Sequence, residues 1–453
     1  MRIQLSDHFT YKRLYKFVLP TIIMMVFTSV YSVVDGLFVS NFTTGTEFAA
    51  LNVIFPLIMI LGSVGFMLGT GGNAVVSKAL GEKDSIKANK IFSMLIYVTI
   101  AFGVVLAVLG ISFARPVAEL LCSAEKELSN AKREEMIEFC VLYGRIILAA
   151  LPAFMLQNAF QGFFVTAEKP RLGLYVIIAA GVGNILLDTL FVAVFKWGLA
   201  GAALATAMSQ TIGGITPIFY FARKNDSLLK LGKTQYDGKV LFEVCLNGAS
   251  ELLSNISASI VTILYNAQLM KYAGVDGVSA YGIIMYANFV FCAIYIGYAI
   301  GAAPIVGYNY GAQNTSELKN IFKKSILSMV AFGMMMIISA IALSRTLATI
   351  FVKDNQALFD LTVHGFRIYA ISFLACGLNI FSSAFFTALG NGLISAFLSI
   401  VRVVLQIVTV FVLPSLITPP LEGIWFAIIT AEILSVFVSC VFLFLKRKQY
   451  HYA

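Results

Sequence analysis

The chain has 453 residues, of which 59% are hydrophobic and only 12% are charged, with a formal net charge of +9. Soluble chains have about 45–50% apolar and about 25% charged residues, so this composition excludes disordered, collagen-like and water-soluble classes. Twelve membrane-crossing helices of about 20 residues need about 240 residues, which this chain can supply with short loops.

Long apolar runs predict twelve transmembrane helices, and therefore an all-α polytopic membrane protein. The runs are too long for the strands of an outer-membrane barrel, which have about ten residues. The polar start through Lys16 and the length of the first run argue against a cleavable signal peptide. In chain order the predicted spans are 14–40, 47–72, 91–114, 138–161, 171–194, 198–221, 240–269, 278–305, 321–343, 361–388, 393–415 and 422–445.

Most Lys and Arg residues lie in the loops on one side of these spans, together with both ends of the chain. Cytoplasmic loops are enriched in Lys and Arg, so both termini are predicted to be cytoplasmic, in a multi-pass protein of the cell membrane. The positive charge then serves orientation and attraction to anionic membrane lipid. No basic stripe alternates with aromatic residues on a soluble segment, so we expect no nucleic-acid partner.

The second half of the sequence repeats the first. Residues 75–92 match 305–322, and the span at 138–161 matches the span at 361–388. The matches keep their order and nearly constant spacing, which predicts two six-helix lobes related by a pseudo-two-fold axis along the membrane normal. The expected domains are an N-lobe at 1–221, a charged cytoplasmic linker at 222–240 and a C-lobe at 241–453.

Two carboxylates, Asp35 and Asp188, lie inside predicted spans of the first lobe. A charged carboxylate at a span centre costs about 2.5–3.5 kcal/mol, so it normally faces a cavity or a partner. Asn184 lies four residues before Asp188, on the same helix face. Carboxylate and amide oxygens can share a proton or coordinate a hard cation such as Na⁺. A buried polar pair that joins helices is the alternative.

Two further sets of polar residues are candidates for substrate binding. Glu251 and Asn255 repeat the four-residue spacing in the seventh span, where a solvated entrance is the alternative. Gln157, Asn158 and Gln161 lie near the inner end of the fourth span. Neutral amides can orient a ligand of several chemistries, or they can bind neighbouring helices.

Two charged residues in later spans have no assigned function. Glu432 has no polar residue one turn away, and Arg402 precedes Gln406 by one turn, where a structural bond is as plausible as a functional one. The six scattered cysteines and three histidines lack metal-ligand spacing. We therefore expect no cofactor, and no metal other than Na⁺ as a coupling ion in place of H⁺.

The chain resembles the multidrug and toxic compound extrusion (MATE) transporters of bacteria over essentially its whole length. The resemblance is carried by Asp35, Pro116–Leu121, the Asn184–Asp188 motif and Gly198–Thr206. It implies that an inward H⁺ or Na⁺ gradient drives export of amphipathic, often cationic organic compounds. It also implies a first-lobe cation site formed by Asp35, Tyr143, Asn184, Asp188 and Thr206.

The same resemblance matches the fourth-span amides to the family's amide-rich region, and Glu251 to an acid found in the seventh span of some members. An Asp found in the tenth span of some members is absent here, and Asn379 is the comparable polar residue. This departure argues against a second ion site in the C-lobe.

We therefore expect a secondary active antiporter that works by alternating access on small drug-like substrates, acts as a monomer and is not an enzyme. The alternative of the same broad fold is a lipid-linked precursor flippase, which needs a basic central cavity. The sequence has no HExxH, GxSxG or Walker motif, which disfavours a membrane enzyme and an ATP-driven pump. A channel and a sensor without transport are further alternatives.

Overall fold

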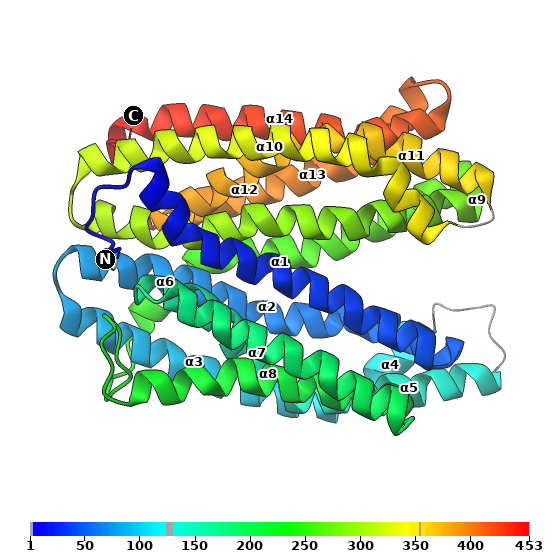
Figure 1. The fold of residues 1–453 in the computed structure, drawn as a ribbon, viewed down its shortest axis with the longest axis horizontal. Helices are drawn as coiled ribbons and strands as arrows, with labels where there is room; N and C mark the ends of the chain where they lie inside the picture. Colours follow the sequence, from blue (N-terminus) through cyan, green and yellow to red (C-terminus); the bar gives the residue numbers. More distant parts are fainter. Residues whose placement is uncertain (1–2, 124–129, 353–354, 453) are drawn as a thin grey trace. The chain divides into compact units, whose positions relative to one another are not determined.

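The computed structural model describes residues 3–123, 130–352 and 355–452, and within these ranges the regular structure is helical (Figure 1). The elements are α1 (Tyr11–Phe42), α2 (Gly45–Gly81), α3 (Ser85–Ser112), α4 (Ala114–Cys122), α5 (Asn130–Ala149), α6 (Leu151–Thr166), α7 (Pro170–Asp188), the π-helix η1 (Thr189–Val194), α8 (Gly198–Ala222), α9 (Gly238–Gly311), α10 (Thr315–Phe351), α11 (Gln356–Ala370), α12 (Ser372–Ala388), α13 (Gly392–Leu416) and α14 (Pro420–Tyr450).

These helices make twelve crossings in the described part of the chain. Eight are long and apolar enough to span a bilayer, and the bent pairs α5–α6 and α11–α12 add one crossing each. α9 has 74 residues, and a non-helical Gly274 (φ 61°, ψ −152°) divides it in two. At about 1.5 Å per residue the two parts of α9 together are about 110 Å long, which is enough for two crossings. α8, which has 25 residues and is rich in Gly, Ala and Thr, supplies the twelfth crossing. The expected all-α polytopic fold is confirmed.

The span expected as one helix at 138–161 is instead two helices, α5 and α6, which meet at an angle of 54°. Pro152 explains the break, because proline lacks an N–H and its ring clashes with the carbonyl of the preceding turn. α11 and α12 are bent by 46° in the corresponding place, without a proline. There the hydroxyl of Ser372 donates to the carbonyl of Tyr369 at 2.7 Å, which satisfies one carbonyl left free at the end of α11.

The chain forms two compact units, which are described separately. Unit 1 runs from the N-terminus to Val26 and from Ala249 to the C-terminus, and unit 2 is Phe27–Gly248. α1 therefore contributes its first half to unit 1 and its second half to unit 2. The unit boundaries fall at different residues from the lobes expected at 1–221 and 241–453, and that lobe assignment stays a prediction.

The segment before α1 is fixed to unit 1 by Glu317, which is buried near the start of α10. Its carboxylate accepts a hydrogen bond from the backbone N–H of Phe9 at 2.9 Å and contacts Nδ1 of His8 at 2.7 Å. In unit 2, the linker at 222–240 is similarly held along α3. The backbone N–H of Lys230 donates to Oδ1 of Asn89 at 2.6 Å. Both segments are thus ordered parts of their units.

Glycines allow α6 to lie in close contact with α2 inside unit 2. A Cβ atom on Gly65 would come within 2.5 Å of the Cα of Met155, and one on Gly69 within 2.7 Å of the Cα of Ala159. Small residues let transmembrane helices approach to backbone contact. This packing buries the polar face of α6 that carries the fourth-span amides.

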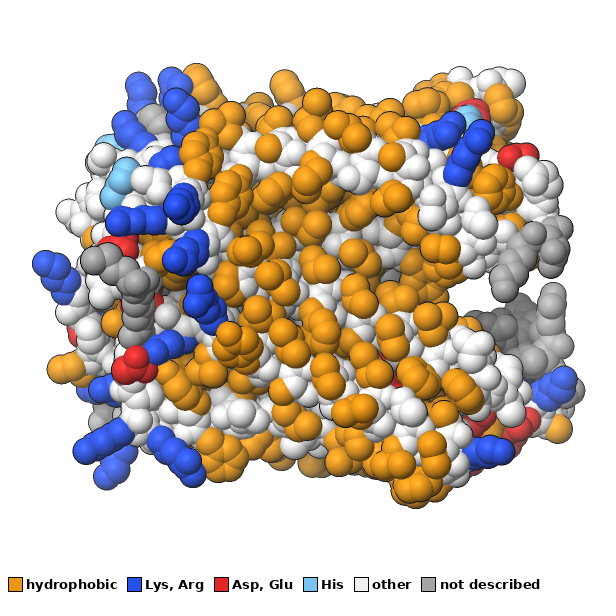
Figure 2. All heavy atoms as spheres, in the orientation of Figure 1, with side chains coloured by type: hydrophobic (Ala, Val, Ile, Leu, Met, Phe, Trp, Pro, Cys, Tyr) orange, Lys and Arg blue, Asp and Glu red, His pale blue; other side chains and the backbone are white. Residues whose placement is uncertain are grey.

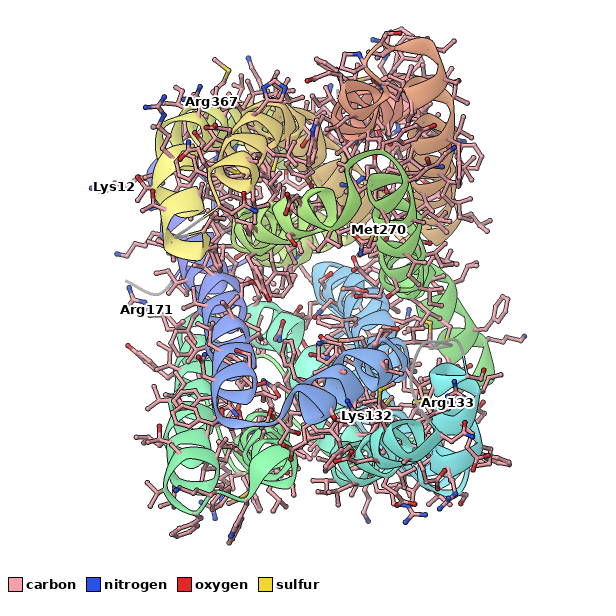
Figure 3. All side chains as sticks on the ribbon, turned by 90° about the vertical axis from the view of Figure 1, so that its right-hand side faces the viewer. Lys12, Lys132, Arg133, Arg171, Met270 and Arg367 are labelled. Carbon is pink, nitrogen blue, oxygen red and sulfur yellow. The ribbon has the colours of Figure 1, made fainter. Side chains whose placement is uncertain are left out.

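Each unit has an apolar middle and charged ends (Figure 2). Lys and Arg gather at the end of unit 1 where both chain termini lie (Figures 1 and 2). Figure 3 faces the opposite end and labels Lys132 and Arg133 of α5 and Arg367 of α11. An apolar band between polar ends fits helices that span a bilayer with their backbone groups satisfied internally. The protein is therefore a multi-pass membrane protein.

Candidate functional site

A pair of carboxyl groups lies inside unit 2, one from α1 and one from α7. Asp35 is partly exposed, whereas Asp188 is completely buried at the last residue of α7. The two side chains are direct neighbours and interact with each other. Neither oxygen of Asp188 accepts a hydrogen bond from any residue that the structure describes. Two adjacent carboxylates, one of them without a donor, are strongly disfavoured in an apolar interior unless a proton or cation joins them.

The other three residues of the expected cation site surround this pair. Thr206 of α8 donates to Oδ1 of Asp35 at 3.5 Å. Asn184 is 1% exposed and lies beside Asp35, and its Nδ2 donates to no acceptor among the described residues. Tyr143 of α5 is 4% exposed and lies within electrostatic range of both carboxyls. Four elements thus bring all five residues together.

The donor atoms of this group are carboxylate, amide, hydroxyl and phenol oxygens. Hard cations such as Na⁺ take ligands of this kind, and the same carboxylates can instead share a proton. No group of three or more His, Cys, Asp or Glu with the geometry of a metal site occurs among the described residues. The set therefore fits a monovalent cation or a proton.

A π-helical turn, η1, starts directly after Asp188. Its hydrogen bonds skip one residue more than an α-helix, as in the bond from the N–H of Phe195 to the carbonyl of Leu190 at 2.8 Å. Such turns are rare and occur often at functional sites, because they place a helix between two hydrogen-bonding registers. Asp188 therefore lies directly before a change in the hydrogen-bonding register of the helix.

The fourth-span amides line the buried face of α6. The Oε1 atoms of Gln157 and Gln161 accept no hydrogen bond from the described residues, although these side chains are only 4% and 3% exposed. Asn158 differs, because its Nδ2 donates to the carbonyl of Gly62 at 3.5 Å and so joins α6 to α2. Gln157 and Gln161 hold unused acceptors, whereas Asn158 has a structural bond.

Two residues that the sequence did not single out extend this polar group. The phenol of Tyr31 interacts with Gln157 and lies near Asp35. Gln210 of α8 is 9% exposed and its Oε1 has no donor among the described residues. Tyr31 lies one turn before Asp35, so a search of the same helix face would have found it. Gln210 lies one turn after Thr206 on α8, so the same search would have found it as well.

The seventh-span pair, Glu251 and Asn255, is joined by a side-chain to backbone hydrogen bond. Nδ2 of Asn255 donates to the backbone carbonyl of Glu251 at 2.8 Å, which is a bond within one helical turn. Both residues belong to unit 1. Their expected substrate contact stays a prediction.

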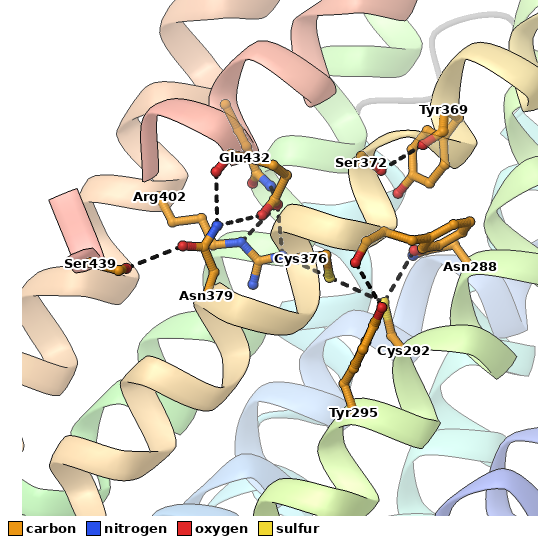
Figure 4. A network of polar contacts seen from close by, with 12 residues as sticks. Asn288, Cys292, Tyr295, Tyr369, Ser372, Cys376, Asn379, Arg402, Glu432 and Ser439 are labelled. Carbon is orange, nitrogen blue, oxygen red and sulfur yellow. Dashed lines mark hydrogen bonds and ion pairs between the residues drawn. The ribbon is translucent and has the colours of Figure 1, made fainter. Parts of the chain in front are cut away.

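Unit 1 has its own buried charge cluster, centred on Glu432 of α14 (Figure 4). Arg402 and Gln406 of α13 and Asn379 of α12 all donate to its carboxylate. The sequence showed no partner for Glu432 because each of them comes from another helix. Asn379, the residue found where some MATE transporters have an Asp, is thus bound to an acid supplied by α14.

Known proteins resemble the chain over nearly its full length. The MatE family model matches residues 20–190 and 252–412. The multidrug export protein MepA of Staphylococcus haemolyticus is 25% identical over 441 residues, which cover 97% of this chain and 94% of that protein. MepA of Staphylococcus aureus is 23% identical over 442 residues, with the same coverage.

Solved structures share the fold. A crystal structure of MATE in complex with MaL6 superposes with a TM-score of 0.91 at 19% identity, over 98% of both chains. An outward-facing multidrug resistance MATE family transporter of the MOP superfamily gives 0.89 at 19% identity, over 97% of this chain and 96% of the other. The family model alone covers well over half of the sequence, and the chain therefore belongs to the MatE family.

Proposed function

We propose that the protein is a secondary active antiporter that exports amphipathic, often cationic organic compounds from the cell in exchange for an inward cation, H⁺ or Na⁺. The observation that carries this proposal is the pair Asp35 and Asp188, of which the buried member has no hydrogen-bond donor and no counter-ion among the described residues. The names of the MepA relatives, which are multidrug export proteins, support the choice of cargo.

The cation acts on this site by removing the repulsion between the two carboxyls. Na⁺ would be held by oxygens of Asp35, Asp188 and Asn184, with Tyr143 and Thr206 as further donors of neutral oxygen. Neutralising the pair allows α1 and α7 to pack more closely at η1, where the hydrogen-bonding register changes. A cationic compound competes for the same negative charge, so cation entry and compound release are coupled.

The amides of α6 are the proposed contacts for the compound itself. The unused acceptors of Gln157 and Gln161 can accept from N–H or ammonium groups, and Tyr31 adds an aromatic face beside them. A site with few fixed charges and several neutral hydrogen-bond acceptors can bind compounds of varied shape. Asn158, Glu251 and Asn255 complete the set of expected substrate contacts as a prediction.

The proposed placement is the cell membrane with both termini in the cytoplasm, because Lys and Arg gather where the termini lie. The protein is proposed to act as a monomer and as a carrier rather than an enzyme. The flippase alternative requires a basic cavity, whereas Asp188, Asn184, Gln157, Gln161 and Gln210, which have buried polar atoms without a partner among the described residues of unit 2, are an acid and amides. Arg402, a cation deep in α13, is paired with Glu432.

Export of a fluorescent organic cation from cells tests the proposal. Wild type should lower the cell-associated dye, and Asp188→Asn should abolish this effect at equal membrane expression. Asp226→Asn is the matched control, because Asp226 is exposed and paired with Lys169 at 2.6 Å. Full export by Asp188→Asn would overturn the role of the carboxyl pair. If no variant exports the dye, the organic-cation cargo is wrong, and a lipid-linked precursor is the compound to test.

A further inference from the structure

Four of the cysteines meet in two close pairs, each inside one unit. Sγ of Cys292 on α9 lies 3.7 Å from Sγ of Cys376 on α12, in unit 1. Sγ of Cys122 on α4 lies 4.0 Å from Sγ of Cys140 on α5, in unit 2. All four are thiols rather than disulfides. Both pairs are therefore close enough to ask whether they can be oxidised, and the answer depends on their surroundings.

The two pairs differ in access. Cys292 is partly exposed and Cys376 is 5% exposed. Cys122 and Cys140 are both 0% exposed, and the thiol of Cys140 donates to the carbonyl of Ala50 at 3.4 Å. A reagent must reach a sulfur before it can react there. The pair in unit 1 offers such an entry at Cys292, whereas the pair in unit 2 is closed.

A positive charge lies beside the inner sulfur of the unit 1 pair. Nη2 of Arg402 donates to Sγ of Cys376 at 3.4 Å and contacts Oε1 of Glu432 at 2.7 Å, which holds the guanidinium group in place. The thiol of Cys292 donates to Oδ1 of Asn288 at 3.2 Å (Figure 4). The thiolate is the attacking species in disulfide chemistry, and a charged N–H group stabilises an anion that it contacts. Cys376 is thus the better placed of the two to attack.

Close packing holds α9 and α12 together around this pair. The hydroxyl of Tyr295, one turn after Cys292, donates to the carbonyl of Phe373 at 2.8 Å. A Cβ atom on Gly377, next to Cys376, would overlap the ring of Tyr295. The sulfurs of a disulfide are about 2.05 Å apart, so these two must approach by about 1.7 Å. Rotation of both side chains about χ1 moves the sulfurs while the packed backbones stay in place.

We propose that Cys292 and Cys376 are a site of reversible oxidation, at which a small, membrane-permeant organic disulfide converts the two thiols into a protein disulfide. The sulfur of Cys292 attacks the reagent, forms a mixed disulfide and releases one thiol, which takes up the proton of Cys292. The thiolate of Cys376 then attacks the sulfur of Cys292. The S–S bond of the protein forms, the mixed disulfide breaks, and a second thiol leaves with the proton of Cys376.

This link would join α9 to α12 one turn after the 46° bend between α11 and α12. Transport by alternating access requires helices to move relative to one another, and a covalent bond between two of them opposes such movement. Oxidation is therefore expected to slow export. This consequence rests on the proposed export function, whereas the oxidation site itself goes beyond it.

Peptide mapping tests the site. The purified full-length protein is treated with 2,2′-dithiodipyridine, the remaining thiols are blocked with N-ethylmaleimide, and the chain is digested without reduction for mass spectrometry. The peptide that carries Cys292 should be linked to the peptide that carries Cys376, and dithiothreitol should separate them. Cys122 and Cys140 are the matched control, because they are almost as close but fully buried. They should stay reduced under conditions that link the first pair.

Transport of a fluorescent organic cation in proteoliposomes tests the consequence. Oxidised wild type should lose most of its transport and regain it after dithiothreitol. Cys292→Ala cannot form the link and should transport as reduced wild type does, before and after the reagent. Cys440→Ala is the control variant, because it removes an exposed cysteine of the same unit, and it should be inhibited like wild type.

The outcomes separate the two proposals. If reduced wild type transports no dye, the export function fails together with the expected inhibition, and the peptide map alone decides the oxidation site. If wild type transports the dye but no link forms between Cys292 and Cys376, or Cys122 and Cys140 link as readily, the oxidation site is refuted and export stands. A link without loss of transport, or equal inhibition of Cys292→Ala, would refute the control of export by this pair.

Discussion

Replacing Asp188 by Asn should stabilise the folded protein while it stops transport. The buried carboxyl has no hydrogen-bond donor, and its neighbour is another carboxyl, Asp35. An asparagine in this place has nearly the same shape, carries no charge and can donate its amide N–H to Asp35. Function and stability are thus opposed at this residue, as is common where an active site keeps unsatisfied groups.

The magnitude follows from two contributions. Leaving a buried polar group unpaired costs about 1–3 kcal/mol, and a hydrogen bond to a charged group contributes about 1.5–3 kcal/mol. Since the native pair partly relaxes, we expect a net gain of about 2 kcal/mol in the free energy of unfolding. For a domain of about 150–250 residues this raises the melting temperature by about 4–8 °C.

The assay is thermal unfolding of the purified protein in detergent, in mildly alkaline, sodium-free buffer. Asp226→Asn serves as the control, because an exposed ion pair contributes about 0–1 kcal/mol. If Na⁺ is the coupling ion, adding it should raise the melting temperature of wild type but not of Asp188→Asn. A lower melting temperature for Asp188→Asn in sodium-free buffer would refute the reasoning, since it would mean that the carboxyl is already well paired.

Three further changes test the packing of the units. Arg402→Met should lower the free energy of unfolding by about 3–5 kcal/mol, because it leaves Glu432 buried without its counter-ion. In a denaturation assay, the double variant that also carries Glu432→Gln should recover most of this loss. Gly65→Ala should lower the free energy of unfolding by about 1–3 kcal/mol, because the added Cβ would press on the backbone of Met155 and push α2 away from α6. Gly36→Ala is the control, because a Cβ there would meet open space, and an equal loss in that variant would contradict the reasoning. Glu317→Ala should release the N-terminal segment and speed tryptic cleavage there, and unchanged cleavage would show that the contact does not hold it.

Much of the fold could be predicted from hydrophobic runs alone, because each crossing needs about 20 apolar residues in one stretch. The break between α5 and α6 was missed, although Pro152 within a predicted span was a usable signal. The π-turn after Asp188 was also missed. It lies in an uninterrupted apolar run, which has no sequence pattern that separates a π-turn from an α-turn.

The site was predictable only where its residues share one helix. Asn184 and Asp188 are four residues apart, so their common face follows from helical geometry. That Asp35 meets them depends on how α1 packs against α7, which the residues alone did not reveal and the family resemblance supplied. Glu432 shows the limit most clearly, because its three donors come from α12 and α13 and none lies one turn away on α14.

The most direct test of the central claim runs the exchange backwards in proteoliposomes. An outwardly directed gradient of an organic cation, with no ion gradient imposed, should drive H⁺ or Na⁺ in the opposite direction, followed with an internal pH dye or radioactive sodium. Wild type should show this counter-movement of one of the two ions and Asp188→Asn should show none. Dye movement by wild type with neither ion moving, or equal ion movement by Asp188→Asn, would contradict antiport through the Asp35–Asp188 pair.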